Sequence, residues 1–363
     1  MTTTDPLPPG STVGILGGGQ LGRMLALAAA RLGMKTHIFC PDPQSPAFEV
    51  TPHKTVALYD DEAALADFAA AVDVVTYEFE NVPARTAEFI AARKPLRPGA
   101  PALAVSQDRL EEKGFLSASG VPVAPYRPVY SLDDLETALA ELGTPAVLKT
   151  TRLGYDGKGQ RIILSLNEAA AAFDALEPKP LVLEAFIPFD KEISVIVARN
   201  ALGDIRHFEP SENVHRDHIL KTSTVPAAIS AGLAAKAGEA ARSIVESLDY
   251  VGVLGIEFFV LPEGNDLLVN EIAPRVHNSG HWTEAVCVTD QFEQHIRAVL
   301  NWPLGDTTRM ADVVMENLIG YEADSVVDLL GPGVRPHLYG KTEARPGRKM
   351  GHLNRIGRET GTK

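Results

Sequence analysis

The chain has 363 residues, of which 45% are hydrophobic, and carries a formal net charge of −13. This length and apolar content are typical of a globular, enzyme-sized protein of about two or three domains. The acidic balance argues against a nucleic-acid partner, which would require a basic surface. Any phosphate-bearing ligand must therefore meet a local cluster of positive charge.

Cysteine usage and the N-terminal residues exclude further classes. The two cysteines, Cys40 and Cys287, form no CxxC pair and the chain has no dense His/Cys tract, so neither a disulfide framework nor a zinc site is predicted. The first ten residues lack the basic and apolar regions of a signal peptide. Since no apolar stretch is long enough for a membrane span, we expect a cytoplasmic protein without a membrane partner.

The first hundred residues alternate strand and helix patterns. Strands are expected at 12–16, 35–40 and 72–77, with helices at 20–32 and 62–71 between them. This order predicts a βαβαβ unit of a parallel sheet. The proline- and glycine-rich segment 97–101 then indicates a domain boundary or hinge.

The pattern changes after the boundary. A helix is expected at 104–119, and strands at 146–149, 161–164, 181–184, 192–197 and 204–208 predict a mostly antiparallel α+β unit. An alanine-rich helix at about 227–248 precedes a hairpin, and the tail from residue 313 offers short strands around its Pro-Gly turns.

The first strand ends in Gly17-Gly-Gly-Gln-Leu-Gly22, which satisfies GxGxxG, and Asp42 follows about twenty residues later. A dinucleotide site of an NAD enzyme has this pattern. A tight strand-to-helix turn that needs glycine for packing gives the same letters. Gln20 and Arg23 also suit polar contacts to another substrate.

A second glycine-rich loop, residues 150–160, lies between two expected strands and directly follows Lys149. It is not a Walker A loop, because no Gly-Lys-Ser/Thr and no helix follow. Gly154, Gly157 and Gly159 would let its backbone amides fold over phosphates, with Lys158 at the tip. The alternative is a flexible, exposed hairpin.

The segment from Ile256 to Ile272 reads as a hairpin with its loop at 262–265. If Leu261 pairs with Leu267, Glu257 faces Glu271 and Phe259 lies opposite Val269. Facing carboxylates at this spacing repel unless a cation lies between them, and Mg²⁺ on substrate phosphates commonly uses one or two carboxylates. A different register, with one acid in solvent, is the alternative.

Two polar clusters follow. Arg275, His277, Asn278, His281 and Trp282 come directly after the Glu271 strand and suit an anionic substrate, although a single histidine would more often be structural. The basic turn 345–349 is either a solvated charged loop or, in an acidic protein, a phosphate clamp.

Together these stretches resemble the ATP-grasp superfamily and, within it, the 5-(carboxyamino)imidazole ribonucleotide synthases of purine biosynthesis. The resemblance covers nearly the whole chain through GGGQLGRM (17–24), YEFENVP (77–83), GYDGKGQ (154–160), NEIAPRVHNSGHWT (270–283) and RPGRKMGH (345–352). It implies a Rossmann-like (pre-ATP-grasp) domain at 1–100, an ATP-grasp domain at 101–300 with a lid at about 122–190, and a small C-terminal β-rich domain at 301–363.

The resemblance also implies a set of site residues. The ATP site would comprise Arg109, Lys149, Gly154, Tyr155, Asp156, Gly157, Lys158, Gly159, Gln160, Glu184, Ala185, Phe186, Ile187, Glu192, His215, Asn270 and Glu271. Glu184 and Ile187 would recognise adenine and Glu192 the ribose, while Glu257 and Glu271 would hold Mg²⁺. Because Asn270 should face away in an ideal strand, its role implies a twisted or ending strand.

The implied reaction is the ATP-dependent carboxylation of 5-aminoimidazole ribonucleotide by bicarbonate through carboxyphosphate. Asp156, Lys158, Arg275, His277 and Lys349 would be catalytic, with Asp156 positioning the amine. Gln20, Glu78, Tyr155, Asn278, Arg348 and Lys349 would bind the substrate. A homodimer is implied as well. Lys158 replaces the family's lid arginine, which keeps charge but loses bidentate geometry, and the chain stops soon after RKMGH.

Three rival functions stay open at this stage. Another ATP-grasp ligase, such as a formate-dependent glycinamide ribonucleotide transformylase, would share the ATP residues and differ at 275–282 and 345–349. An NAD oxidoreductase would use the loop at 17–22 and leave Glu257 and Glu271 without a role. A nucleotide-sensing module would bind ATP without turnover.

Overall fold

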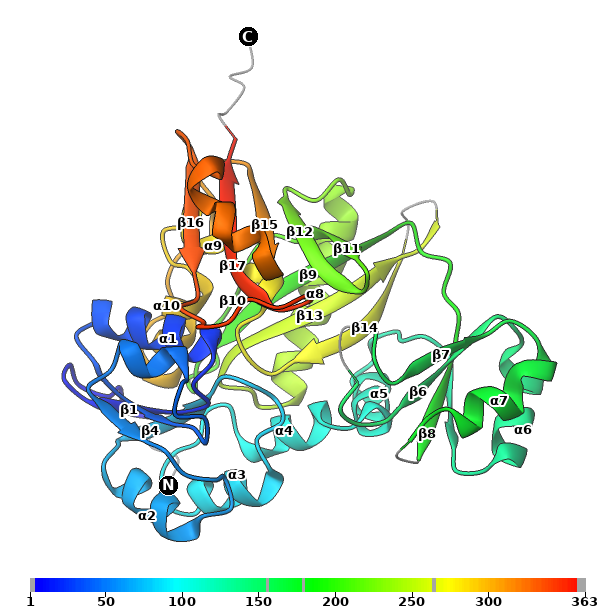
Figure 1. Ribbon diagram of the computed structural model, residues 1–363, viewed down its shortest axis with the longest axis horizontal. Coiled ribbons are helices and arrows are strands. Elements are labelled where there is room, and N and C mark those ends of the chain that lie inside the picture. Colours follow the sequence, from blue (N-terminus) through cyan, green and yellow to red (C-terminus); the bar gives the residue numbers. More distant parts are fainter. Residues whose placement is uncertain (1–3, 155–156, 178–179, 263–265, 358–363) are drawn as a thin grey trace.

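The computed structural model describes residues 4–154, 157–177, 180–262 and 266–357. It contains three sheets and the helices that cover them (Figure 1). Among the residues described, no helix combines the length and the apolar character needed to cross a membrane.

The N-terminal unit is a parallel four-stranded sheet of order β3-β2-β1-β4. Its elements are β1 (Thr12–Leu16), α1 (Gln20–Arg31), β2 (Lys35–Phe39), β3 (His53–Thr55), α2 (Glu62–Ala70), β4 (Val74–Tyr77) and α3 (Ala84–Ala91). Side chains alternate across β1, so that Val13 and Ile15 pack with Leu25 of α1 while Leu16 packs with Phe68 of α2. The predicted βαβαβ unit is confirmed, and the short edge strand β3 is an addition to it.

The single helix predicted at 104–119 is wrong, because two helices occupy this region. They are α4 (Ala100–Ser106) and α5 (Arg109–Ala118). The break lies at Gln107, whose side-chain amide donates to the carbonyls of Glu80 and Val82, and at Asp108, whose carboxylate accepts from the Leu110 amide at 3.0 Å as the N-cap of α5.

A small antiparallel sheet of order β5-β8-β6-β7 follows. Its strands are β5 (Tyr126–Val129), β6 (Ala146–Thr150), β7 (Gln160–Ile163) and β8 (Leu181–Ala185), and it packs on α6 (Leu132–Leu142) and α7 (Ala169–Asp174). This lid sheet stands apart from the rest of the fold, with its two helices on the outer side (Figure 1). Its other face is therefore available to a ligand held against the large sheet.

The large sheet has nine strands in the order β14-β13-β9-β11-β12-β15-β17-β16, with β10 beside β9. They are β9 (Lys191–Arg199), β10 (Ile205–His207), β11 (Ser211–Arg216), β12 (Ile219–Val225), β13 (Gly252–Val260), β14 (Leu267–Ala273), β15 (Val313–Ile319), β16 (Val334–Leu338) and β17 (Lys349–Ile356). The predicted C-terminal strands are present, and they continue this sheet through the β12–β15 pairing.

Helices surround the large sheet. The predicted alanine-rich helix is α8 (Ala231–Ser247), which begins later than expected because Ser230 accepts from the Leu233 amide as its N-cap. The helix α10 (Gln291–Val299) packs between α1 and strands β9 and β13 of the large sheet, and the short α9 (Thr283–Val286) contacts β17.

The β13–β14 register confirms one predicted pairing and corrects two. Glu257 pairs with Glu271, as predicted. However, Phe258 rather than Phe259 lies opposite Val269, and Val260 rather than Leu261 pairs with Leu267. A β-bulge at Asn270 causes the difference, because an extra residue on β14 shifts the register by one. Residues 263–265 of the predicted hairpin loop lie outside the described residues.

Candidate active site

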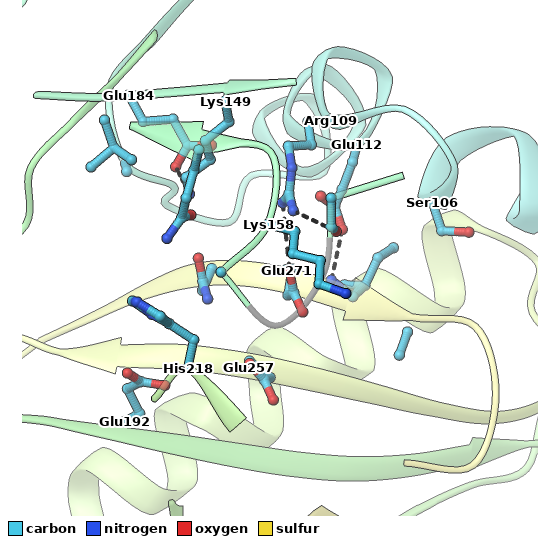
Figure 2. A pocket seen from close by; sticks show the side chains of 18 of the residues that line it. Ser106, Arg109, Glu112, Lys149, Lys158, Glu184, Glu192, His218, Glu257 and Glu271 are labelled. Atoms are coloured by element: carbon cyan, nitrogen blue, oxygen red, sulfur yellow. Dashed lines mark hydrogen bonds and ion pairs between the residues drawn. The ribbon is translucent and has the colours of Figure 1, made fainter. Parts of the chain in front are cut away.

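A cavity of about 700 Å³ lies between the lid sheet and the large sheet. Of the residues predicted to bind ATP, its lining includes Arg109, Lys149, Gly154, Gly157, Lys158, Gln160, Glu184, Ala185, Phe186, Ile187, Glu192, His215, Asn270 and Glu271. Glu257, Arg275, His277, Asn278 and Lys349 also line it. Its size is within the range of small-molecule sites. Figure 2 shows side chains of both sheets converging on it.

The bulge explains how neighbouring residues of one strand reach the cavity together. In a regular strand Asn270 and Glu271 would point to opposite faces. Here both line the cavity, because Asn270 is the extra residue that the bulge turns out of the ladder. The bulge is the kind of strand irregularity that the sequence analysis expected at Asn270.

Glu257 and Glu271 form a carboxylate pair on the large sheet. Burial, and then the facing charge of Glu271, raises the pKa of Glu257. His277 lies on the same side, with Nε2 3.7 Å from Glu257 Oε1. A hard divalent cation would relieve the repulsion between the two acids, so their donor set fits Mg²⁺.

On the lid side, two lysines hold one buried carboxylate. Lys149 Nζ lies 2.9 Å and Lys113 Nζ 3.4 Å from the same Oε2 atom of Glu184. Burial opposes ionisation of Glu184, but the charges of Lys149 and then Lys113 prevail and lower its pKa. Among the described residues, the other oxygen, Oε1, has no hydrogen-bond partner. The structure thus leaves a fixed acceptor at the cavity wall.

Arg109 links the lid loop to the carboxylate pair. Its guanidinium donates to the Gly154 carbonyl at 3.2 Å and lies 3.5 Å from Glu271 Oε2. Glu112, one turn along α5, is buried and accepts from the Ile272 amide at 2.7 Å. Burial, and then the nearby Glu271 charge, raises the pKa of Glu112 to about 8. A protonated Glu112 avoids a third negative charge here.

Glu192 and His215 pair on adjacent strands of the large sheet, with Glu192 Oε2 3.0 Å from His215 Nδ1. Burial lowers the pKa of His215, but the hydrogen bond and charge of Glu192 raise it by more, so the net shift is upward. The pair presents a carboxylate and an imidazole to the cavity, and both groups lie close to Glu257.

Cationic and neutral donors gather at the other end of the cavity. Arg275 donates to Glu80 Oε2 at 2.5 Å, and although burial opposes ionisation of this acid, the Arg275 charge lowers the pKa of Glu80 to about 2. Burial, and then the charges of Arg275 and Lys349, lowers the pKa of His277 to about 3. His277 is therefore neutral near pH 7 and acts as a hydrogen-bonding group rather than a cation.

The lid loop requires glycine at two positions. Gly159 has a φ of +70°, and an added Cβ would lie 2.6 Å from Thr150 Oγ1. Gly157 has a φ of +76°, and a Cβ there would lie 2.5 Å from the His218 ring. Tyr155 and Asp156, which were predicted for this loop, lie outside the described residues.

Of the residues that the family resemblance assigned to ATP or substrate, four within the described ranges do not line this cavity, namely Gln20, Glu78, Gly159 and Arg348. His281 and Trp282 of the predicted polar cluster are buried and do not line it either. The Glu78 carboxylate accepts from the amides of Gly19 at 2.5 Å and Gly22 at 2.8 Å. It thereby occupies the N-terminal amides of α1, where a dinucleotide pyrophosphate would bind. This geometry argues against the NAD alternative and supports the packing interpretation of the glycine loop.

The sequence reasoning missed several residues at or beside the cavity. Glu80, Glu112 and His218 line it, while Lys113 and Lys341 contact the lining residues Glu184 and Lys349. The helical period offered one signal, because Glu112 precedes the buried Leu116 by four residues and so shares its face. Lys341 gives no such signal. Its Nζ donates to the Lys349 carbonyl at 2.6 Å, and burial, followed by the charge of Arg348, lowers its pKa to about 8.

Comparisons with known proteins agree with this geometry. Sequence models match at residues 11–107 (ribonucleotide synthetase preATP-grasp domain), 114–292 (ATP-grasp domain) and 313–362 (phosphoribosylaminoimidazole carboxylase C-terminal domain). The N5-carboxyaminoimidazole ribonucleotide synthase of Brucella melitensis is 55% identical over 353 residues, covering 96% of this chain and 97% of that protein.

Solved structures are similar over the same extent. An ADP complex of an N5-carboxyaminoimidazole ribonucleotide synthetase superposes with a TM-score of 0.94 at 43% identity, covering 98% of this chain and 94% of that one. The Aspergillus clavatus N5-carboxyaminoimidazole synthase in complex with ADP and 5-aminoimidazole ribonucleotide superposes with a TM-score of 0.89 at 32% identity, covering 96% and 94%.

Proposed function

The chain belongs to the family of N5-carboxyaminoimidazole ribonucleotide synthases, which are ATP-grasp ligases of purine biosynthesis, and we propose how its residues perform the ATP-dependent carboxylation of 5-aminoimidazole ribonucleotide. The transformylase alternative is not favoured by these relatives. One observation carries the proposal. A single cavity joins the lysine-held Glu184, the Glu257–Glu271 pair and the donors around Arg275.

ATP lies between the lid sheet and the large sheet. Glu184 Oε1 and the neighbouring chain to Ile187 bind adenine, since a fixed carboxylate acceptor suits the adenine amino group. Glu192 binds the ribose hydroxyls. Lys149, Arg109 and the amides of the lid loop neutralise the phosphates.

Glu257 and Glu271 would hold Mg²⁺, with Asn270 beside them. When bound, the ion supplies charge neutralisation on the phosphates of ATP. The raised pKa of Glu257 supports this assignment, because a largely buried carboxylate that faces a second one stays ionised only beside positive charge.

Bicarbonate is the co-substrate. Its oxygen attacks the γ-phosphorus of ATP, the bond to ADP breaks, and carboxyphosphate forms. The carbon–oxygen bond of carboxyphosphate then breaks to give CO₂ and phosphate. The exocyclic nitrogen of the aminoimidazole bonds to the CO₂ carbon and loses one proton. A lid closed by the 154–160 loop keeps water from the intermediate.

The residues around Arg275 hold the second substrate. Arg275 lines the cavity with its guanidinium fixed by Glu80 and by the Val276 carbonyl, so its charge has a set orientation. Neutral His277 and Asn278 donate or accept hydrogen bonds beside it, and Lys349 and Lys158 supply positive charge toward the carboxylate being transferred. Tyr155 and Asp156 act from the lid loop, with Asp156 positioning the amine.

Further assignments rest on the family resemblance. Gln20, Arg348 and Glu78 contribute to the ribose-phosphate end, Glu78 by shaping the glycine loop. Domains at 1–100, 101–300 and 301–363 are supported by the separate first sheet and by the three matched segments. The protein works in the cytoplasm as a homodimer.

The decisive experiment is ADP release with Mg²⁺ and bicarbonate, measured with and without 5-aminoimidazole ribonucleotide. We expect strong stimulation by that nucleotide, together with consumption of bicarbonate into an acid-labile product. Asp156→Asn should retain ATP binding and lose carboxylation. ATP binding without nucleotide-stimulated ADP release would overturn the substrate assignment, and full carboxylation by Asp156→Asn would overturn the role of that residue.

A further inference from the structure

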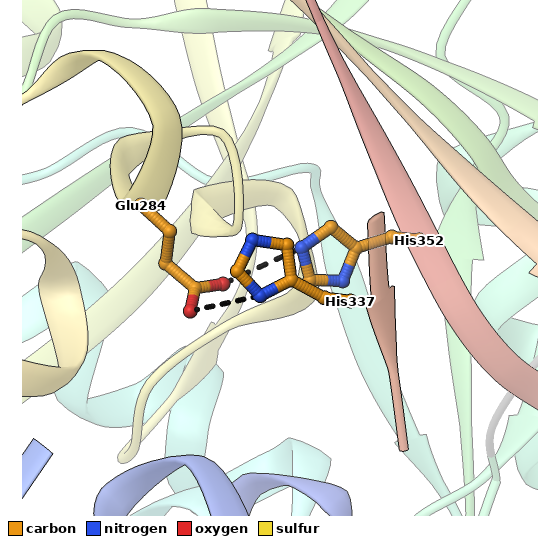
Figure 3. A group of neighbouring side chains, drawn as sticks. All are labelled: Glu284, His337 and His352. Atoms are coloured by element: carbon orange, nitrogen blue, oxygen red, sulfur yellow. Dashed lines mark ion pairs between the residues drawn. The ribbon is translucent and has the colours of Figure 1, made fainter. Parts of the chain in front are cut away.

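A second cluster of ligand-type side chains lies away from the ATP cavity. It consists of Glu284 of α9, His337 of β16 and His352 of β17 (Figure 3). None of the three lines the cavity between the sheets. The reaction described above therefore leaves this cluster without a role.

The carboxylate of Glu284 lies against both imidazoles. One carboxylate oxygen faces each imidazole, with Glu284 Oε1 3.4 Å from His337 Nδ1 and Glu284 Oε2 3.4 Å from His352 Nε2. One ligand atom from each residue lies within 4.8 Å of the other two. Figure 3 shows the carboxylate facing the ring nitrogens of both histidines.

These separations are too long for charge-assisted hydrogen bonds, which measure about 2.7–2.9 Å. The separations can be compared with the distance between two ligand atoms of one metal ion. Zinc bonds of about 2.0–2.2 Å in a tetrahedral site place neighbouring ligand atoms roughly 3.4 Å apart. Each carboxylate–imidazole separation therefore lacks a shared proton and leaves room for a cation between Glu284 and the ring that faces it.

Two buried atoms of the cluster have no hydrogen-bond partner among the described residues, namely Glu284 Oε2 and His352 Nε2. His352 is fully buried, and its other ring nitrogen, Nδ1, lies 2.9 Å from the Tyr339 hydroxyl. A histidine that binds a metal through one nitrogen commonly hydrogen-bonds through the other. Tyr339 thus fixes the ring with Nε2 directed at Glu284.

We propose that Glu284, His337 and His352 form a binding site for a transition-metal dication of the zinc class, separate from the Mg²⁺ pair. Two imidazole nitrogens and one carboxylate suit Zn²⁺ or Co²⁺, whereas Mg²⁺ prefers an all-oxygen shell. Because the ligands come from α9, β16 and β17, the ion ties the C-terminal hairpin to the helix after the Arg275 loop.

The stacking of the two rings specifies how the ion enters. His337 and His352 lie nearly parallel, at 9° with centroids 4.6 Å apart. A metal lies close to the plane of each imidazole that binds it, so parallel rings cannot both reach one ion. His337 must rotate out of the stack, and its side chain, which is 24% exposed at the rim, has room to do so.

Cobalt absorption tests the site directly. The full chain, stripped with a chelator, is titrated with Co²⁺ in excess Mg²⁺, which competes for the Glu257–Glu271 pair. We expect about one equivalent of Co²⁺ with intense visible bands typical of tetrahedral coordination, displaced by Zn²⁺. His337→Gln should weaken binding at least 100-fold, and Zn²⁺ should raise the melting temperature of the wild type but not of this variant.

Two matched variants separate the possible sites. His53→Gln, at an exposed histidine, controls for adventitious surface binding, and Glu257→Gln controls for the catalytic acids. Both should bind Co²⁺ like the wild type. Absence of the tetrahedral bands, unchanged binding in His337→Gln, or loss of binding in Glu257→Gln would each overturn the proposal.

Discussion

Replacing Lys113 tests how the adenine end of the cavity is built. Lys113→Met keeps the length of the side chain and removes the ammonium that lies 3.4 Å from Glu184 Oε2. At this distance the attraction is about 5 kcal/mol for an effective dielectric constant of about 20. The ammonium is nearly fully buried, so its desolvation offsets part of that attraction.

The remaining lysine limits the effect. Removing one partner of a buried ion pair typically costs about 3–5 kcal/mol, but Glu184 keeps Lys149 at 2.9 Å. We therefore expect a loss of about 1.5–3 kcal/mol in ATP binding, which is a rise in KM for ATP of about 10- to 150-fold. The value of kcat should change little, because Lys113 does not touch the phosphates in the proposed arrangement.

Nucleotide selectivity supplies the sharper readout. An ionised Glu184 accepts from the amino group of adenine and repels the 6-keto oxygen of inosine triphosphate. Without Lys113 the pKa of Glu184 rises, and its protonated form donates to that keto oxygen. The preference for ATP over inosine triphosphate, measured as a ratio of kcat/KM values from ADP release, should narrow.

A surface lysine provides the control. Lys236→Met removes an ammonium 3.6 Å from Asp266, where both side chains are more than half exposed. This variant should leave KM for ATP and the selectivity ratio nearly unchanged. If Lys113→Met, folded by circular dichroism, keeps KM for ATP and the selectivity ratio within about twofold of the wild type, the reasoning about Glu184 is refuted.

Three further substitutions test other parts of the site. Glu257→Gln should lower kcat/KM at least 100-fold, yet raise the melting temperature measured without Mg²⁺ at pH ~8. The raised pKa of Glu257 makes this carboxyl group cost stability above the pKa of the unfolded chain, and the amide removes that cost. Glu112 has a pKa of about 8 in the fold against 4.5 in the unfolded chain, so the stability of the protein falls as pH rises between these values. Glu112→Gln should therefore raise the free energy of unfolding by about 1–3 kcal/mol at pH ~8.5 and leave it unchanged at pH ~4, as measured by urea denaturation. Gly157→Ala should raise KM for ATP about tenfold, because its Cβ would clash with His218, whereas Gly203→Ala, at a φ of +90° in open space, should leave KM unchanged.

Each of these has a contrary outcome. A Glu257→Gln enzyme that is less stable without Mg²⁺ would show that the carboxylate makes net favourable contacts in the free protein. A stability difference for Glu112→Gln that is equal at both pH values would mean that Glu112 does not hold an extra proton. Equal KM values for ATP in the two glycine variants would show that the approach of Gly157 to His218 does not affect ATP binding.

The Glu257–Glu271 pairing shows how far sequence patterns reach. Alternation and the hairpin signal predicted this pairing correctly, but from a register at the hairpin loop that is wrong by one residue. The bulge at Asn270 was out of reach, because a bulge changes the register without a required residue type. The same limit applies to Lys113, whose partner Glu184 lies 71 positions away and is brought near only by the packing of α5 beneath the lid sheet.

Glu78 illustrates a different limit. The sequence motif placed it beside the substrate, yet its carboxylate accepts from the amides of the glycine loop. Both uses require an acid at that strand end, so residue type alone does not separate them. The Glu284–His337–His352 cluster likewise carries no spacing signature, because its ligands come from three separate elements and the expectation of no zinc site rested on local spacing.

The continuity of the nine-stranded sheet bears on protein engineering. Since β12 and β15 pair directly, a cut between the ATP-grasp segment and the C-terminal strands would expose two unpaired strand edges. Lys349, at the start of β17, would also lose its fixed relation to Glu257, because the two reach the cavity through the same sheet. The C-terminal segment is therefore unsuited to exchange between relatives as a detachable module. Chimeras are better joined at the connections of the lid sheet, which shares no strand with the large one.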